Sequence, residues 1–299
     1  MIGNPGTAFP WNYFREFIAP GADRFAILKK IMEEGALDHS VLTVSENRHF
    51  LVTAPEPEKD PLTASRKTIL VAHYDRFPGS PGANDNSAAV FILAETAIKL
   101  MKEKVNNWLI IFTDKEELRE GEGIQDQGAY SLAAGFKDSS YETARFYNFD
   151  ACGTGDTLII STTAEYLLKN ENAGGNEKIR SRIRELRDRA LEIARDLQLP
   201  RVLLLPTPFS DDAGFLRAGF GAQTITMLPS EECSSLVSIL RKDPRFAEAL
   251  VNHEQRAVHS KQLIPETWRC MNSPSDSHLR LTPKHFNTVL RFAEALCKY

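Results

Sequence analysis

Three apolar segments that each end at an ionisable residue constrain the fold of this 299-residue chain most strongly. They read TILVAHYD, NWLIIFTD and RFYNFD, and their last residues are 75, 114 and 150. Continuous apolar runs of this length are typical of strands buried on both faces of a parallel sheet. The carboxyl ends of such strands share one edge of the sheet, where ligands collect. The sequence therefore predicts an α/β fold with a functional site along that edge.

The remaining segments predict a three-layer α/β/α domain around a mixed, mostly parallel sheet. We expect helices within 11–37 and at 87–104, 129–136, 177–197 and 282–298, a β-hairpin over 41–54 around a Glu46-Asn47 turn, and strands at 158–162, 202–205 and 223–228. Residues 55–64 and the polar stretch 163–176 predict loops, and 230–269 predicts a helical insertion. We interpret residues 1–299 as a single domain with that insertion at about 230–270.

Composition excludes several classes of partner. The chain has 36 basic and 40 acidic residues, a net charge of −4, so no general basic field favours nucleic acid or an anionic membrane. No apolar run approaches the roughly 18 to 20 residues that span a bilayer. The four cysteines form no Cys-x-x-Cys pair, and the first residues lack the charge and apolar run of a secretory signal. We therefore expect a cytoplasmic protein with reduced thiols; the sequence leaves the number of subunits open.

Several common catalytic motifs are absent from the sequence. It has no Walker loop, no Gly-x-Gly-x-x-Gly after a strand, no Gly-x-Ser-x-Gly elbow and no His-Glu-x-x-His helix. The ionisable residues at the strand ends remain, together with Asp85 on the turn 82–86. Imidazole and carboxylate groups that converge at a strand end are the ligands of many metal sites.

Each of these residues also has an ordinary structural interpretation. His73 and Asp75 could form a surface pair, and Glu116 and Glu117 could be solvated in a charged loop. Asp85 could cap the following helix. Asp150 alone could form a turn. Their joint occurrence at the ends of the predicted strands favours a metal site over these separate interpretations.

The order of these motifs resembles the co-catalytic zinc aminopeptidases and their glutaminyl cyclase relatives. The motifs are His73-x-Asp75, Gly82-Ala83-x-Asp85-Asn86, Glu116-Glu117 after an apolar strand, Asn148-x-Asp150-x-x-Gly153, and Ser210-Asp211 with Phe215 and Gly219. The resemblance covers roughly residues 65–228 and the carboxy-terminal helix. It implies a zinc exopeptidase fold of the phosphorylase/hydrolase-like type, zinc as cofactor and a peptide as substrate.

The resemblance also implies a role for each matching residue. His73 would bind one zinc ion, Asp85 would bridge two ions, and Glu117 would complete the first site. Asp150 would ligate the second zinc. Glu116 would act as the general base that takes a proton from the zinc-bound water.

The resemblance also implies a role for Asp75, which would not bind zinc itself. It would orient the His73 ring and raise its basicity as a ligand.

The sequence departs from the family pattern at the last metal ligand. The family has a histidine in a His-Ser/Thr-x-x-Asp stretch, and this chain reads Asn272-Ser273-Pro274-Ser275-Asp276. A neutral amide oxygen is a far weaker zinc ligand than imidazole. On the implied roles, the second site would keep only Asp85 and Asp150 as strong donors. The cyclase branch relies on the missing histidine together with Asp85 and Glu117, so we disfavour cyclase activity.

Three outcomes stay open at this stage. The chain could be an aminopeptidase with one tightly held metal, or with a second, weakly held and harder ion. His278, six residues beyond Asn272, could enter the site by a loop shift. The chain could instead be a non-catalytic binding or scaffold domain on the same fold. Hydrolysis of non-peptide amides is a further enzymatic alternative.

Overall fold

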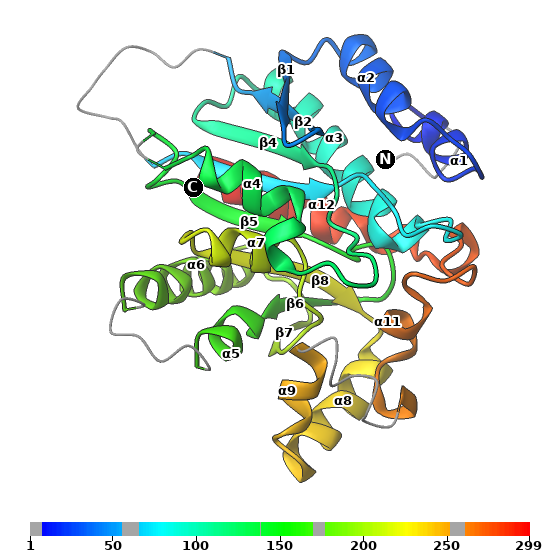
Figure 1. The fold of residues 1–299 in the computed structure, drawn as a ribbon, viewed down its shortest axis with the longest axis vertical. Helices are drawn as coiled ribbons and strands as arrows, with labels where there is room; N and C mark the ends of the chain where they lie inside the picture. The colour runs from blue at the N-terminus through cyan, green and yellow to red at the C-terminus, as the bar shows by residue number, and fades with distance from the viewer. Residues whose placement is uncertain (1–7, 56–65, 138, 170–176, 252–260) are drawn as a thin grey trace.

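The computed structural model describes residues 8–55, 66–137, 139–169, 177–251 and 261–299. Within these ranges a single eight-stranded sheet runs through the molecule in the order β1-β2-β4-β3-β5-β8-β6-β7 (Figure 1). The strands are β1 (His39–Val44), β2 (Asn47–Thr53), β3 (Thr68–His73), β4 (Trp108–Thr113), β5 (Arg145–Phe149), β6 (Thr157–Ser161), β7 (Val202–Leu205) and β8 (Ala222–Leu228).

The sheet is mixed and mostly parallel, as predicted. The pairs β3–β4, β3–β5, β5–β8 and β6–β7 are parallel, whereas β1–β2, β2–β4 and β6–β8 are antiparallel. His73 at the end of β3 lies beside Thr113 at the end of β4. Asp150 directly follows β5 on the other side of β3. The three apolar segments therefore end side by side at one edge of the sheet.

Helices cover both faces of the sheet. They are α1 (Phe14–Phe17), α2 (Arg24–Glu34), α3 (Ala88–Lys102), α4 (Gly128–Ala134), α5 (Thr163–Lys169), α6 (Glu177–Asp196), α7 (Asp211–Arg217), α8 (Ser230–Lys242), α9 (Phe246–Val251), α11 (Glu266–Cys270) and α12 (Phe286–Lys298). Short helical turns are η1 (Trp11–Tyr13), η3 (Ala83–Ser87), η4 (Ile124–Asp126), η5 (Lys261–Leu263), η6 (His278–Arg280) and η7 (Pro283–His285).

The alternation of side chains along β3 separates two cores. Leu70 and Ala72 pack in the larger core with α3, α6, α12 and the amino-terminal helices. Ile69 and Val71 point to the opposite face and pack with α4 and α7, which lie in front of the sheet in Figure 1. Successive strand residues face opposite sides, so a strand buried on both faces must be apolar throughout. This explains the continuous apolar runs of the sequence.

The amino-terminal hairpin turns one residue earlier than predicted. Val44 pairs with Asn47, so the two turn residues are Ser45 and Glu46, not Glu46 and Asn47. Both have positive φ, 49° and 72°. A two-residue hairpin of this kind favours positive φ at both central positions because its twist matches that of the strands.

The prediction of a loop over 163–176 is wrong in its first half. Residues 163–169 form α5, and residues 170–176 lie outside the described part of the chain. Ala164 and Leu168 lie one helical turn apart and pack against Ile183 of α6 and Leu216 of α7. The Asn- and Gly-rich residues that suggested a loop begin only after this helix.

The other predicted elements are confirmed to within a few residues. The insertion after residue 230 is helical, with α8, α9 and α11 below the sheet in Figure 1, and residues 252–260 lie outside the described part. Residues 56–64 of the predicted connector also lie outside it. None of the helices in the described ranges is both long enough and apolar enough to cross a bilayer.

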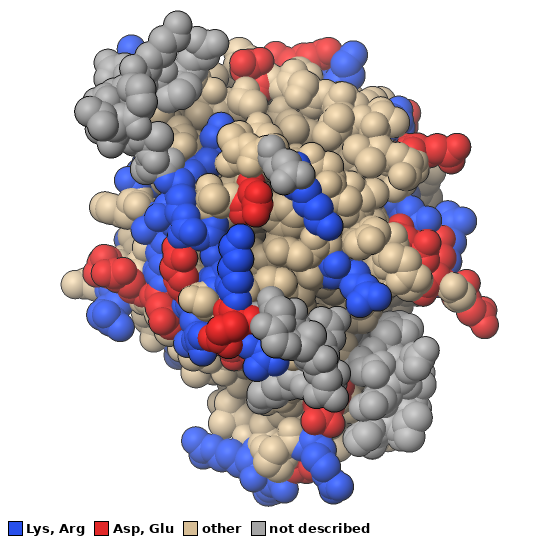
Figure 2. All heavy atoms as spheres, turned by 60° about the vertical axis from the view of Figure 1, so that its left-hand side comes forward, with Lys and Arg blue, Asp and Glu red and all other residues tan. Residues whose placement is uncertain are grey.

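The charged helix α6 is the helix predicted at 177–197, and it is amphipathic. Ile183, Leu186, Ala190 and Ile193 are buried. Its arginines pair with nearby carboxylates, including Arg182 with Glu185, Arg184 with Glu177 and Arg187 with Glu165. Figure 2 shows basic and acidic side chains interspersed on the face to the left of Figure 1. This pattern indicates a solvated face rather than an anion site.

Candidate metal centre

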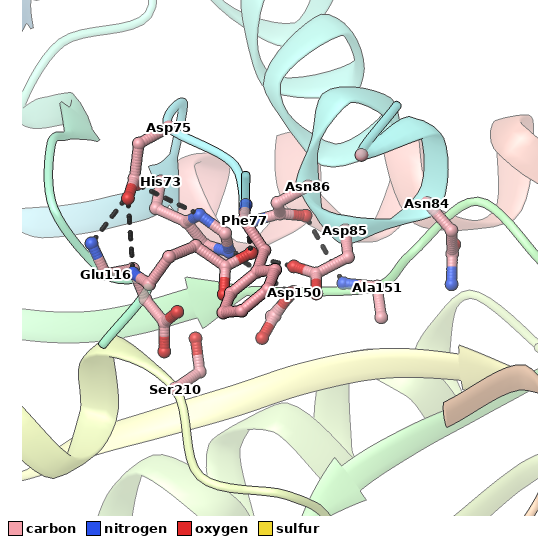
Figure 3. A network of polar contacts seen from close by, with 12 residues as sticks. His73, Asp75, Phe77, Asn84, Asp85, Asn86, Glu116, Asp150, Ala151 and Ser210 are labelled. Carbon is pink, nitrogen blue, oxygen red and sulfur yellow. Dashed lines mark hydrogen bonds and ion pairs between the residues drawn. The ribbon is translucent and has the colours of Figure 1, made fainter. Parts of the chain in front are cut away.

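His73 occupies the carboxyl end of β3 and is fully buried. Its Nδ1 atom lies 3.3 Å from Oδ1 of Asp75 (Figure 3). Its Nε2 atom lies 3.2 Å from Oδ1 of Asp85 and 3.6 Å from Oδ1 of Asp150. A carboxylate on one ring nitrogen directs the other nitrogen toward a metal ion. The predicted contact of Asp75 with His73 is therefore present, and Nε2 faces two carboxylates.

The three residues His73, Asp85 and Asp150 form one potential ligand group. Their ligand atoms all lie within 4.8 Å of one another. In the described ranges, a search for three or more His, Cys, Asp or Glu residues that could hold one metal ion finds this group. The predicted roles, in which Glu117 completes the first site with His73 and Asp85 and Asp150 belongs to the second, stay a prediction. The structure brings Asp150 beside His73 because β5 lies next to β3 in the sheet.

The turn that carries Asp85 is held by a second buried carboxylate, Asp276. The backbone N–H groups of Asn84 and Asp85 donate to the two Asp276 oxygens at 2.9 and 3.0 Å. Burial raises the pKa of Asp276 to about 7. The sequence placed Asp276 in the motif that departs from the family but predicted no role for it. Nothing in its local sequence indicates a partner some 190 residues away.

Asn86 fastens the same turn to the end of β5. Its side-chain N–H donates to the carbonyl of Phe149 at 2.8 Å, and its Oδ1 accepts from the N–H of Ala151 at 3.2 Å (Figure 3). These two bonds bracket Asp150. They therefore fix the separation of Asp85 and Asp150, which come from different parts of the chain.

Asp75 also positions the two glutamates that follow β4. Its oxygens accept from the backbone N–H groups of Glu116 and Glu117, both at 3.1 Å. The two glutamate side chains then have different partners. Glu116 Oε1 accepts from Nε2 of Gln127 at 3.1 Å, whereas Glu117 Oε1 accepts from the N–H of Phe77 at 3.1 Å. Sequence reasoning missed Gln127, which follows a Gly-rich loop with no recognisable motif.

Burial and mutual repulsion shift the pKa values of this cluster. Burial raises the pKa of Glu116 well above its usual value, and burial and then the charge of Asp85 raise that of Glu117 to about 9. Burial alone would lower the pKa of His73, but the nearby carboxylates of Asp150, Asp75 and Asp85 outweigh it and leave that pKa raised. Carboxylates thus outnumber the one imidazole, and a bound cation would compensate their charge.

Two further buried carboxylates lie beyond the predicted set. Asp211 accepts from Oγ1 of Thr113 at 2.5 Å, and Asp212 accepts from the N–H of Ser210 at 2.9 Å. Burial raises their pKa values to about 7 and about 6. Asp211 also interacts electrostatically with His73 and Asp150. The sequence brought Ser210 and Asp211 into the family pattern without assigning them a function.

Comparison with known proteins identifies the family. The model of peptidase family M28 matches residues 52–269, which include every predicted site residue except Asn272. The chain belongs to peptidase family M28. No curated protein matches its sequence.

Solved structures similar to this M28 member share its fold at low sequence identity. A leucine aminopeptidase precursor from Bacteroides thetaiotaomicron is 14% identical, with a TM-score of 0.62 over 96% of this chain and 94% of its own. Tannerella forsythia glutaminyl cyclase is 14% identical, with a TM-score of 0.60 over 96% of each chain. A zinc aminopeptidase from Bacillus subtilis is 17% identical, with a TM-score of 0.53 over 83% of this chain but 48% of its own. The family supports a metal-dependent peptidase, and the fold is the predicted one.

In this M28 member, Asn272 lines a cavity that Asp85 and Asp150 of the ligand group also line. It is exposed and has a left-handed backbone, with φ of 58°. His278 is not among the described residues that line the cavity; its Nε2 atom lies 2.9 Å from Nη1 of Arg15 at the surface. The described arrangement therefore gives no support to His278 as a substitute ligand.

The cavity beside the ligand group His73, Asp85 and Asp150 has a volume of about 920 Å³. Carboxylates from Asp85, Glu116, Glu117 and Asp150 form the wall at the strand ends. The remaining wall combines the polar residues Arg119, Glu120, Glu122, Glu248 and Asn272 with a larger apolar set. The apolar residues are Phe77, Leu118, Ile124, Tyr166, Leu167, Pro208, Phe209, Val251 and Met271. A largely apolar cavity with a few convergent polar groups is typical of a small-molecule or peptide site.

Proposed function

We propose that this M28 member is a zinc-dependent aminopeptidase that hydrolyses the first peptide bond of its substrate. The observation that carries the proposal is the convergence of His73, Asp85 and Asp150, of which Asp85 and Asp150 line one cavity together with Glu116. Nε2 of His73 and Oδ1 of Asp150 are buried and have no hydrogen-bond partner among the described residues. Buried polar atoms are normally paired, and one imidazole with two carboxylates is a donor set that suits zinc. The residues therefore fit the ion.

Glu116 would act as the general base. When bound, zinc polarises a peptide carbonyl and lowers the pKa of water. Glu116 would accept a proton from the attacking water and return it to the leaving amine. The Gln127 side chain holds the Glu116 carboxylate in place, and Asp75 holds its backbone. Asp75 would in addition keep His73 oriented with Nε2 toward the ion.

The charge of the cavity favours an amino terminus over a carboxyl terminus. Seven carboxylates line the described wall, from Asp85, Glu116, Glu117, Glu120, Glu122, Asp150 and Glu248, and Arg119 is the one cationic residue among the described lining residues. Even with zinc bound, this excess of carboxylates over cationic residues would attract an α-ammonium group and repel an α-carboxylate. A carboxypeptidase would need the opposite balance.

The experiment compares a free with a blocked amino terminus and removes the base. We expect hydrolysis of amino-acid p-nitroanilides or short peptides with a free amine, and none of the N-acetylated forms. Glu116→Gln should lower kcat by about 10²- to 10⁴-fold with zinc content unchanged. Glu33→Gln is the matched control, because Glu33 is exposed on α2, is not among the described lining residues and is expected to keep kcat.

Other outcomes would favour the alternatives. Hydrolysis of non-peptide amides alone would favour an amidohydrolase, and a folded, zinc-loaded chain without hydrolytic activity would favour a binding or scaffold domain. Cyclisation of amino-terminal glutamine would favour a cyclase.

All four cysteines are free, which supports our proposal of a reducing, cytoplasmic location.

A further inference from the structure

The two halves of the expected metal centre differ in how complete they are. In the first half, His73, Asp85 and Asp150 supply three buried ligand atoms that lie within 4.8 Å of one another. A group of three protein ligands with an open fourth position is the pattern of catalytic zinc sites. Asp85 and Asp150 both line the cavity, so an ion held by this group would be accessible from it.

The second half lacks an equivalent set. It consists of Glu117, a share of Asp85 and, at the family's histidine position, Asn272. Oε1 of Glu117 already accepts from the N–H of Phe77 at 3.1 Å. The Asn272 side chain is neutral and exposed. Zinc binds imidazole and thiolate far better than an amide oxygen, so these donors do not fit a second zinc ion.

We propose that this chain is a one-zinc member of its family, with the ion held by His73, Asp85 and Asp150 and with no second zinc bound at Glu117 and Asn272. Asp85 would then be a ligand of one ion and not a bridge between two. The ligand set also differs from the one that the resemblance implies for cyclases, because that set needs a histidine at position 272.

The first test is zinc stoichiometry. The protein is stripped with a chelator, equilibrated with zinc, dialysed, and analysed for zinc per chain by elemental analysis, with calorimetric titration of the stripped protein beside it. We expect one equivalent. Two equivalents retained with similar affinity, or none after equilibration, would overturn the proposal.

The second test restores the missing ligand. Asn272→His should raise the retained zinc to two equivalents, since it places an imidazole in the cavity that Glu117 and Asp85 also line. The substitution suits the backbone, because histidine, like asparagine, tolerates the left-handed conformation at φ of 58°. If the variant still retains one equivalent, residue 272 does not face a vacant second site, and the proposal fails.

A control variant and a ligand variant locate the first ion. Asn272→Gly removes the amide without backbone strain and should keep one equivalent. A loss of zinc in this variant would mean that Asn272 is itself a ligand, against the proposal. Asp150→Asn should lose the ion, whereas Glu117→Gln should keep it; the reverse result would move the ion to the other half. Circular dichroism confirms that each variant is folded.

These readouts are independent of peptide hydrolysis. A chain with one zinc ion that cleaves no peptide would keep this inference and refute the proposed aminopeptidase function. A chain with two zinc ions that cleaves peptides would do the reverse. The proposal shares with the proposed function only the assignment of zinc to this site.

Discussion

The two walls of the cavity differ in how the protein holds them. The strand-end wall carries Asp85, Glu116, Glu117 and Asp150, all buried and fixed by hydrogen bonds of their side chains or backbone. A second part of the lining, which we call the outer wall, comes from α5, α9 and the stretch before η6. It includes Tyr166, Glu248, Val251, Met271 and Asn272. Most of its residues are half-buried or exposed.

The two walls therefore have different structural requirements. The strand-end wall needs fixed separations between donor atoms, and strands paired in one sheet supply them because their register is set along their whole length. The outer wall needs only shape and polarity. A ligand position on the outer wall is therefore the one that a single substitution can remove without disturbing the sheet, and residue 272 is such a position.

The largest effect is expected where the strand-end wall loses its imidazole. His73→Ala removes one of three zinc ligands, so we expect zinc to be lost on dialysis and hydrolysis to fall to background. Elemental analysis and peptide hydrolysis measure both. His278→Ala is the matched control, because His278 lies at the surface beside Arg15 and should leave both unchanged. Zinc retained at full occupancy in the His73 variant would contradict the site.

A pH effect is expected from His49, which is buried in β2 next to Asp114 on the strand-end side. Burial lowers the pKa of His49 to about 4, from an ordinary value of 6.5. The unfolded chain therefore binds this proton more readily, and the stability that the neutral ring contributes is present above pH 6.5 and is lost as the pH falls toward 4. The shift corresponds to up to about 3 kcal/mol of unfolding free energy.

Denaturation of the metal-free protein between pH 7 and 4 measures this effect. His49→Gln keeps an acceptor for the N–H of Asp114 but does not titrate. The variant should lose stability less steeply than the unaltered chain as the pH falls. Equal slopes for both proteins would show that His49 does not contribute.

A smaller effect is expected at Gln127, whose side chain donates to Glu116 at 3.1 Å. Gln127→Leu should lower kcat by about tenfold, because a hydrogen bond to a charged group is worth about 1.5 to 3 kcal/mol and part of this is recovered by rearrangement. Zinc content should stay unchanged. Gln125→Leu, at an exposed neighbouring position, is the control for kcat. A change in zinc content but not in kcat would place Gln127 in metal binding instead.

The smallest effect is expected on the outer wall. Val251→Ala removes two methyl groups from the apolar lining, so kcat/KM for substrates with a large apolar first residue should fall by about three- to tenfold. Substrates that begin with alanine should change less. Leu263→Ala is the control, since Leu263 is exposed and is not among the described lining residues. A loss of zinc in the Val251 variant would contradict the division of tasks between the walls.

The sequence predicted the strand ends well because burial on both faces leaves a strong local signal. The continuous runs before His73, Asp114 and Asp150 mark three adjacent strands, and the structure places them side by side. The same reasoning was wrong about α5, where Asn and Gly beyond residue 169 outweighed the spacing of Ala164 and Leu168. It was also wrong by one residue at the hairpin turn, because two adjacent positions were compatible with a tight turn.

The sequence by itself determined the order of the elements, the buried sheet and the candidate residues at its edge, since these follow from polarity repeated over short distances. Only the tertiary structure decided that Asp150 lies beside His73 and Asp85, that Asp276 holds the Asp85 turn, and that Gln127 holds Glu116. These contacts depend on which strands become neighbours and on how distant loops meet. The free energy that selects such neighbours comes from burying the whole sheet, and no single motif along the chain carries it.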